Sequence, residues 1–271
     1  MATLKSVAEV AKMREAGKIV AEMLAQTSAA AKPGVSTAEL DRIAREVIKR
    51  HGATSSFLGY GQPPFPATIC TSINQEIVHG IPSPRRRLKD GDIVGIDAGA
   101  IVDGWHADAA VTIAVGAAPE EALRLIETTA EALRRGIAAA RVGSRIGDIG
   151  AAVQAYAEGQ GYSVVRSLVG HGIGRAMHED PQVPNYGLAD RGLPIRPGLC
   201  LAIEPMLNAG VAETEVLGDG WTIVTADGAL SAHFEHTIWC GEGGPVVLTS
   251  AGEEADTRIR AELGAGKLVR A

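Results

Sequence analysis

The sequence predicts an α+β protein of one domain whose two halves share the same plan. Two observations carry this prediction: a pair of helical patterns occurs twice along the chain, and a strand pattern that ends in an acidic residue also occurs twice. With 271 residues, 46% of them hydrophobic, the chain is long enough to bury one large core. Aromatic residues are few, so this core must rest on Ala, Val, Ile and Leu.

Helical periodicity appears in four segments, two in each half of the chain. These segments cover residues 7–31, 37–50, 119–140 and 146–158. Glycines bracket the second helix of each pair with the same spacing: Gly34 and Gly52 in the first half, Gly143 and Gly161 in the second. The repeated spacing favours two structurally equivalent helix pairs.

Strand patterns follow each helix pair. In the first half they cover residues 68–73, 93–98 and 105–115, and Asp103-Gly104 between the last two is a strong hairpin signal. Residues 88–97 match residues 195–204, because in each segment a basic residue stands two before a glycine and an acid follows that glycine by six. Chance among common residues is the alternative, but two independent matches at nearly the same separation favour an internal duplication.

No linker-like stretch separates the halves, so the sequence predicts a single catalytic domain over residues 1–250. Residues 251–271 are expected to form a polar C-terminal tail, as a surface helix with a loose end, because this segment is charged and contains glycine. The expected domain is therefore α+β, with each half contributing strand acids to a shared centre.

Composition excludes several classes of protein. A formal charge of −6 argues against a nucleic-acid binder, which would carry a basic surface. The three cysteines, Cys70, Cys200 and Cys240, form no C-x-x-C pair and suit a reducing compartment. The N-terminus has no apolar secretory core, and no apolar run is long enough to cross a bilayer. These features predict a cytoplasmic protein without a membrane or nucleic-acid partner.

Two aspartates in the predicted hairpin are the first candidates for chemistry. If Asp103-Gly104 forms a two-residue turn, Gly99 lies opposite Asp108, and Asp97 is a diagonal neighbour of Asp108 on the same face. Carboxylates that converge on an apolar strand face repel each other unless a cation lies between them. Exposed strand aspartates are the alternative, but the flanking residues are apolar on both strands.

The second half supplies two further acids. Glu204 lies in the most apolar acid-bearing run of the chain, and Glu235 lies in a strand pattern reached through the turn Asp227-Gly228. A lone buried glutamate is rare without a partner. Four strand acids, two from each half, would form a two-metal site if one or more nitrogen ligands completed it.

His171 and His178 are the candidate nitrogen donors, in the segment Gly170-His-Gly-Ile-Gly-Arg-Ala-Met-His-Glu. Alternating glycines make a helix improbable there, and the spacing does not fit a nucleotide-binding fingerprint. His79 follows an apolar pair and ends at a turn. Structural roles are the default for the other four histidines, although His106 could face the site beside Asp108. These four are His51, His106, His233 and His236.

Five motifs, in this order, resemble those of type I methionine aminopeptidases over nearly the whole chain. They are Thr71-Ser-Ile-Asn-Gln-Glu-Ile-Val-His-Gly-Ile-Pro, Asp92-Ile-Val-Gly-Ile-Asp, Gly170-His-Gly-Ile-Gly, Ile203-Glu-Pro-Met and Ser231-Ala-His-Phe-Glu-His-Thr. The resemblance implies the "pita-bread" fold, in which two pseudo-symmetric halves form a curved antiparallel sheet covered by helices. It also implies removal of the initiator methionine from nascent proteins when the next residue is small.

The resemblance further implies a site with two divalent metal ions. Metal ligands fall on Asp97, Asp108, His171, Glu204 and Glu235. Glu204 would also move a proton, His178 would stabilise the developing oxyanion, and His79 would hydrogen-bond the peptide nitrogen. An oxygen-rich ligand set with one histidine suits iron(II), manganese(II) or cobalt(II), with zinc possible.

The methionine pocket is implied by resemblance as well. Phe65, Cys70 and Trp221 match substrate-binding positions, as do His79 and His178, whereas Gly59, Gln62 and Met177 stand where relatives often have cysteine or aromatic residues. The implied partners are N-termini of nascent chains, near the ribosome, and the expected state is a monomer. The alternatives are an Xaa-Pro aminopeptidase or prolidase of the same fold, and a binding protein that has lost catalysis.

Overall fold

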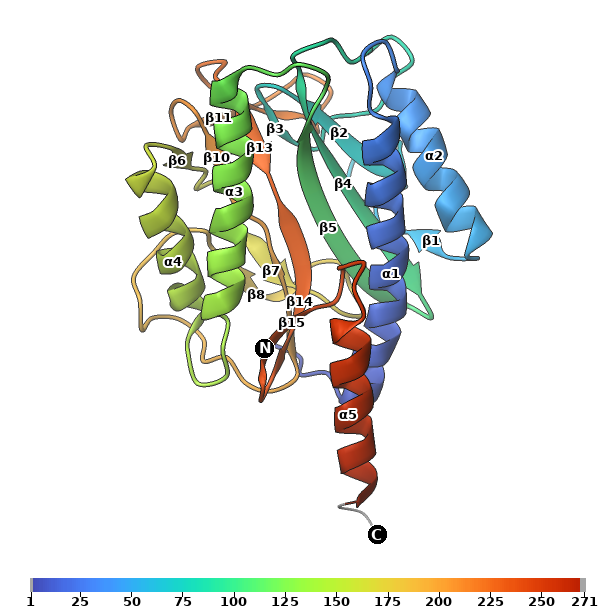
Figure 1. Cartoon of the computed structure of the whole chain (residues 1–271), viewed down its shortest axis with the longest axis vertical. Coiled ribbons are helices and arrows are strands. Elements are labelled where there is room, and N and C mark those ends of the chain that lie inside the picture. Colours follow the sequence, from blue (N-terminus) through green and yellow to red (C-terminus); the bar gives the residue numbers. More distant parts are fainter. Residues whose placement is uncertain (1, 269–271) are drawn as a thin grey trace.

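A computed structural model describes residues 2–268 and has the predicted α+β architecture (Figure 1). The helices are α1 (Val7–Ala30), α2 (Thr37–Arg50), α3 (Glu120–Ala139), α4 (Ile146–Gly159) and α5 (Glu254–Leu268). The first-half strands are β1 (Thr54–Ser55), β2 (Ile69–Ile73), β3 (Glu76–Val78), β4 (Ile93–Val102) and β5 (Trp105–Ala114).

Ten further strands belong to the second half of the chain. They are β6 (Ser163–Val164), β7 (Gly170–Gly172), β8 (Glu179–Val183), β9 (Leu199–Ile203), β10 (Met206–Asn208), β11 (Thr214–Val216), β12 (Ile223–Thr225), β13 (Ser231–His233), β14 (Glu235–Gly241) and β15 (Gly244–Val247). Every strand pair in the structure is antiparallel, as expected for sheets built from hairpins and short returns.

A nine-stranded sheet forms the frame of the molecule, with the order β1-β4-β5-β14-β9-β7-β8 and with β2 on β4 and β15 on β14. The contact between β5 and β14 joins the two halves, since Glu235 lies opposite Ala110 and His236 opposite Ala109. Outward from this seam, β4 and then β2 on one side correspond to β9 and then β7 on the other. The sheet is therefore arranged symmetrically about the β5–β14 seam.

Two hydrogen bonds at equivalent places confirm the duplication. The N–H of Gly34, at the end of the first helix pair's connection, donates to the carbonyl of Leu88 at 2.7 Å. The N–H of Gly143 donates to the carbonyl of Ile195 at 3.1 Å. Both glycines have a positive φ, at 90° and 94°, a conformation that favours glycine over other residues. Each bond thus ties a helix pair to the start of the strand segment that ends in an acid.

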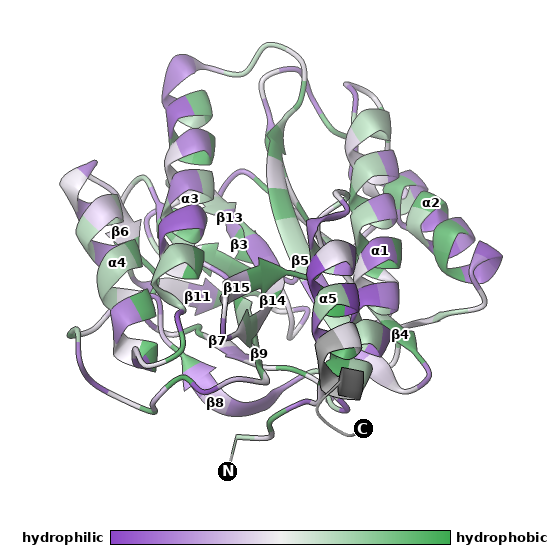
Figure 2. Cartoon of the chain, turned by 60° about the horizontal axis from the view of Figure 1, so that its bottom comes forward, coloured by the Kyte–Doolittle hydropathy of each residue, from purple (hydrophilic) through white to green (hydrophobic). Residues whose placement is uncertain are grey.

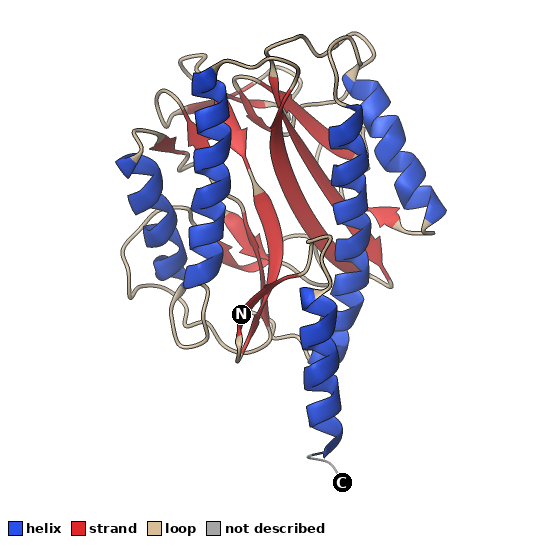
Figure 3. Ribbon diagram, in the orientation of Figure 1, coloured by secondary structure: helices blue, strands red, loops and turns tan. Residues whose placement is uncertain are grey.

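The four helices α1 to α4 cover one face of the large sheet, with α1 and α3 lying over its centre (Figures 1 and 3). Buried residues of α1 and α2 pack on β4 and β5 in one apolar cluster, and those of α3 and α4 pack in clusters of the second half. In Figure 2, hydrophobic residues run along β5, whereas α3 carries hydrophobic and hydrophilic residues in alternation. Small buried residues in β4 and β5, such as Ala98 and Ala109, allow the helices to approach this sheet closely.

Strand ends differ from the sequence prediction in three places. The strand predicted over residues 93–98 continues to Val102, so β4 and β5 pair along their whole length. The strand pattern from Ser231 onward is interrupted at Phe234, which divides it into β13 and β14 in different sheets. The Asp227-Gly228 turn connects β12 and β13, which also belong to different sheets. Tertiary pairing, which local alternation does not specify, sets these limits.

The segment predicted as a polar tail, residues 251–271, contains α5, which projects beyond the rest of the molecule in Figure 1. Ala255 and Ile259 are buried against α1 in a cluster with Met13 and Leu248. Residues 269–271, the last three of the predicted tail, lie outside the described residues. Among the described residues, no helix is long and apolar enough to span a bilayer.

Candidate active site

A cavity opens where the two halves of the large sheet meet, and charged and apolar side chains line it together. The lining residues are Phe57, Tyr60, Phe65, Cys70, His79, Asp97, Asp108, His171, Met177, His178, Glu204, Trp221 and Glu235. All ten residues predicted for the site are in this list. They come from segments that lie as far apart as β2 and β14 in the chain.

The β4–β5 hairpin brings Asp97 and Asp108 together as its turn predicts. Val102 pairs with Trp105 across Asp103-Gly104, and the register continues without a bulge to Gly99 opposite Asp108. Asp97 lies opposite Ala110, two residues further on the same face. Because the hairpin turn fixes this register, the two carboxylates are diagonal neighbours at the cavity.

The second half presents its acids on the other side of the β5–β14 seam. Glu235 is the first residue of β14 and is buried, and Glu204 directly follows β9, where Pro205 ends the strand. His236 lies opposite Ile203 in the β14–β9 pairing, which places the two glutamates at the same level of the sheet. Equivalent strands of the two halves therefore carry the four acids.

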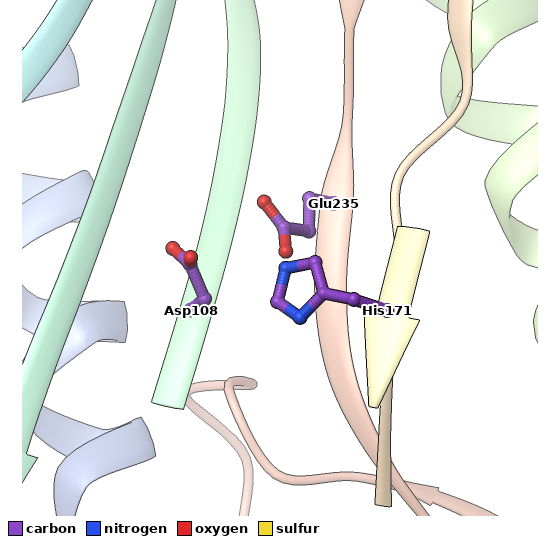
Figure 4. A group of neighbouring side chains, drawn as sticks. All are labelled: Asp108, His171 and Glu235. Atoms are coloured by element: carbon purple, nitrogen blue, oxygen red, sulfur yellow. The ribbon is translucent and has the colours of Figure 1, made fainter. Parts of the chain in front are cut away.

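His171, in β7, faces the acids of both halves. One ligand atom from each of Asp108, His171 and Glu235 lies within 4.8 Å of those of the other two (Figure 4), and all three side chains are buried. Nε2 of His171 lies 3.6 Å from Oε1 of Glu204. Nδ1 of His171 donates to the carbonyl of Gly172 at 2.8 Å, so the lone pair of the neutral ring is on Nε2. The ring is thus oriented to bind a cation.

Burial and mutual repulsion make these acids unusual. Burial raises the pKa of Asp97 to about 7. Burial and the charges of Glu235 and Asp97 raise the pKa of Asp108 well above its usual value. Burial and neighbouring carboxylates also raise the pKa of Glu204 and of Glu235. Such shifts are typical of a site whose charges need a cation to offset them.

The residues present fit a metal site. Three carboxylate oxygens, Oδ1 of Asp97, Oδ1 of Asp108 and Oε1 of Glu235, are buried and accept no hydrogen bond from any residue that the structure describes. Buried carboxylates without donors are costly, and a divalent cation is the partner that would satisfy several of them together. Burial, followed by the charge of His178, lowers the pKa of His171 to about 4, which keeps the ring neutral as a ligand must be.

Two further histidines lie at the mouth of the site. The ring of His178 packs on that of His171 with centroids 4.3 Å apart, and its Nδ1 lies 2.5 Å from the hydroxyl of Tyr60. Burial lowers the pKa of His178. His79 has a φ of 60° and meets the edge of Trp221 with centroids 5.8 Å apart. Burial and the charge of His178 lower the pKa of His79 to about 4, so both rings are neutral near pH 7.

Apolar side chains form the other wall of the cavity. Phe57, Phe65, Cys70 and Met177 are buried in one cluster, with Trp221 packed against it. The structure places Phe57 and Tyr60 on this wall, whereas Gly59 and Gln62 are exposed and do not line the cavity. Sequence reasoning missed both aromatic residues, because a loop containing three prolines and two glycines has no periodicity that would show which residues point inward.

His233 was also missed. Its buried Nε2 lies 3.9 Å from Oε2 of Glu204 and 4.0 Å from Oε2 of Glu235. The signal was available, since a residue two before Glu235 in an extended segment shares its face. The other histidines lie outside the lining: Nδ1 of His106 is 3.0 Å from Oγ of Ser56. His51 contacts Glu22, and His236 contacts Thr249.

Comparisons with known proteins agree with this geometry. Residues 11–242 match the model of metallopeptidase family M24. The chain therefore belongs to metallopeptidase family M24.

Within that family, the chain groups with the methionine aminopeptidases. It is 50% identical to the methionine aminopeptidase of Clostridium acetobutylicum over 92% of this chain and 99% of the relative. The crystal structure of methionine aminopeptidase from Thermotoga maritima superposes with a TM-score of 0.90 at 41% identity, covering 92% of this chain and 100% of that one. The prolidase structure from Pyrococcus horikoshii, at 22% identity and a TM-score of 0.74, shares the fold, and this chain covers 65% of it.

Proposed function

We propose that this chain is a type I methionine aminopeptidase that hydrolyses the first peptide bond of new proteins when methionine is followed by a small residue. One observation carries the proposal: four carboxylates and a histidine line the same cavity as an apolar cluster rich in aromatic and sulfur-containing groups. Such a cluster suits an unbranched thioether side chain. The site thus combines a hydrolytic centre with a pocket for methionine.

Asp97, Asp108, His171, Glu204 and Glu235 would hold two divalent ions, of which iron(II), manganese(II) and cobalt(II) suit the donor set, with zinc possible. When bound there, two such ions would supply an activated water and polarise the scissile carbonyl. Glu204 takes the proton of the attacking water and delivers it to the leaving amine, since its carboxylate faces the cavity.

The neutral histidines act on the substrate. His178 donates a hydrogen bond to the carbonyl oxygen as negative charge develops on it. His79 hydrogen-bonds the nitrogen of the scissile peptide and orients the bond. Phe65, Cys70 and Trp221, together with Phe57 and Met177, enclose the methionine side chain. The substrates are N-termini of nascent polypeptides in the cytoplasm, met near the ribosome, and the enzyme acts as a monomer.

The test is peptide hydrolysis after metal removal and addition of manganese(II) or cobalt(II). Met-Ala-Ser, Met-Leu-Ser, Leu-Ala-Ser and Ala-Pro-Ser are compared. Release of methionine from Met-Ala-Ser alone, and only with metal, is the expected result. Cleavage of Ala-Pro-Ser would instead indicate an Xaa-Pro peptidase, and no cleavage with any metal would indicate a binding protein.

A further inference from the structure

The loop between β7 and β8 carries two residues of the cavity, Met177 and His178. It leaves the sheet at Gly172 and returns at Glu179, and these two residues are paired across the strands. The position of both side chains therefore depends on what holds residues 173–178. Contacts within the loop and contacts with distant segments both contribute.

The side chain of Glu179 accepts hydrogen bonds from the backbone of the loop. Its Oε1 accepts hydrogen bonds from the N–H of Arg175 at 2.7 Å and from that of Ala176 at 3.2 Å. These two donors lie directly before Met177. One carboxylate oxygen thus fixes the backbone that presents Met177 and His178.

The loop is also attached to the β4–β5 hairpin. The N–H of His106 donates to the carbonyl of Gly174 at 2.8 Å. Nη1 of Arg175 donates to the carbonyl of Asp103 at 2.9 Å, and the guanidinium lies 4.2 Å from the ring centroid of Trp105. The loop therefore rests on the turn of the hairpin that carries Asp97 and Asp108.

The second oxygen of Glu179 binds Lys5, which lies 174 residues earlier in the chain, before α1. Nζ of Lys5 lies 2.7 Å from Oε2 of Glu179, with the lysine side chain 1% exposed and the glutamate side chain 15% exposed. Nζ also donates to the carbonyl of Thr3 at 2.9 Å, and the N–H of Lys5 donates to the carbonyl of Gly198 at 2.7 Å. Lys5 thus links the segment before α1, the start of β9 and the loop.

Two glycines provide the space that this ion pair needs. A Cβ at Gly174 would lie 2.5 Å from Cε of Lys5 and 2.7 Å from Oε1 of Glu179. A Cβ at Gly198, which has a φ of +89°, would lie 2.6 Å from the carbonyl oxygen of Lys5. The third glycine of Gly170-His-Gly-Ile-Gly is therefore needed for close packing on Lys5.

We propose that Lys5 is a positioning residue for the cavity, which acts through its buried ion pair with Glu179 to hold Met177 and His178 in place. A buried pair of this kind has one favourable geometry, because separating the charges would leave each of them desolvated and unpaired. The proposal rests on the role of His178 given above. A positioning role for Lys5 differs from a purely stabilising role. The latter would change the population of folded protein and leave the turnover of each folded molecule unchanged.

The test is a double-mutant cycle between Lys5→Met and His178→Ala in the full chain reconstituted with manganese(II). Both kcat and KM on Met-Ala-Ser are measured well below the unfolding midpoint, together with bound manganese per molecule. Lys5→Met is expected to lower kcat about tenfold in the wild-type background and to leave it unchanged in the His178→Ala background. Bound manganese per molecule is expected to stay at the wild-type level when Lys5→Met is introduced in either background. Lys12→Met, at an exposed position of α1, is the matched control and keeps the wild-type kcat.

Lys5→Met alone could prevent folding, because it leaves the Glu179 carboxylate without its cation. Lys5→Met combined with Glu179→Gln removes both charges and keeps an oxygen to accept from Arg175 and Ala176. This variant is therefore expected to fold and to show the same loss of kcat.

Two outcomes overturn the inference while the role of His178 stands: a wild-type kcat in both Lys5 variants, or an equal loss with and without His178. If His178→Ala itself keeps the wild-type kcat, the role of His178 fails, and the inference fails with it.

Discussion

The hydroxyl of Tyr60 lies 2.5 Å from Nδ1 of His178, across the mouth of the cavity. If His178 donates from Nε2 to the substrate carbonyl, its neutral ring must accept at Nδ1, and the phenol is then the donor in this contact. Tyr60 would therefore select the tautomer of His178 that the proposed chemistry requires. This contact joins the loop between β1 and β2 to the loop between β7 and β8, although the two residues are 118 positions apart in the sequence.

Replacement of Tyr60 by phenylalanine tests this link. Tyr60→Phe keeps the aromatic wall and removes the donor, so kcat on Met-Ala-Ser should fall about tenfold, the equivalent of about 1.4 kcal/mol, with little change in KM. Tyr186→Phe, whose hydroxyl contacts the carbonyl of Arg166 outside the cavity, is the control. A wild-type kcat in Tyr60→Phe would show that the tautomer is set in another way.

Replacement of Asp97 tests the metal-ligand assignment. Asp97→Asn removes one anionic ligand at nearly constant shape, so we expect bound metal per molecule and activity to fall together. The far-UV spectrum should stay unchanged, because the side chain contributes repulsion rather than packing to the fold. Asp190→Asn, at an exposed turn with a positive φ that asparagine tolerates, is the control. A wild-type kcat in Asp97→Asn would show that Asp97 is not a metal ligand.

Metal removal should make stability depend on pH in a defined direction. The pKa of Asp97 is raised from 3.8 to about 7 in the folded chain, mainly by burial, and those of Asp108 and Glu235 are raised as well. Between about pH 4 and pH 7 the metal-free folded chain therefore binds more protons than the unfolded chain. Its free energy of unfolding must then fall as pH rises through this window, by up to about 1.4 kcal/mol per pH unit for each proton involved.

Thermal unfolding with and without EDTA measures this effect. The Tm of the EDTA-treated protein should be lower at pH 8 than at pH 6, and the Tm difference from the metal-loaded protein should be larger at pH 8. Bound metal offsets the repulsion between the ionised acids, so the loaded protein should lack this loss. A metal-free Tm that is equal or higher at pH 8 would contradict the assignment of these acids.

Arg14 offers a prediction about stability away from the site. Its buried guanidinium donates at 2.7 Å to the carbonyls of Leu248, Ser250 and Gly252, and Asp256 of α5 accepts from it at 2.9 Å. Arg14→Met should lower the free energy of unfolding by about 3 kcal/mol, because the buried carbonyl of Leu248 and three partly buried acceptors lose their donor. Denaturant unfolding measures the loss, with exposed Arg42→Met as the control.

Since Arg14 does not line the cavity, kcat per folded molecule should be unchanged in Arg14→Met. A large loss of kcat without a loss of stability would mean that α5 influences the site. The same measurement would show whether the segment after residue 250 contributes to the domain beyond the packing of Ala255 and Ile259.

Local rules and repetition made much of this protein predictable. The Asp103-Gly104 turn fixes the pairing of Gly99 with Asp108, because a two-residue turn leaves one register, and the structure has that register. Internal duplication then led from Asp97 to Glu204, since equivalent segments of two similar halves occupy equivalent places. The strand pattern placed Glu235 among the four candidate acids, and motif resemblance then favoured His171 over His178 as the nitrogen ligand.

Contacts between residues far apart in the sequence depend on the tertiary structure alone. Lys5 meets Glu179, Tyr60 meets His178, and His233 turns toward Glu204 only after the sheet has brought the halves together. No turn or periodicity relates these residues in the chain. Their positions follow from the packing of whole elements, so a pattern read along the sequence specifies the sheet and its acids but not the side chains that surround them.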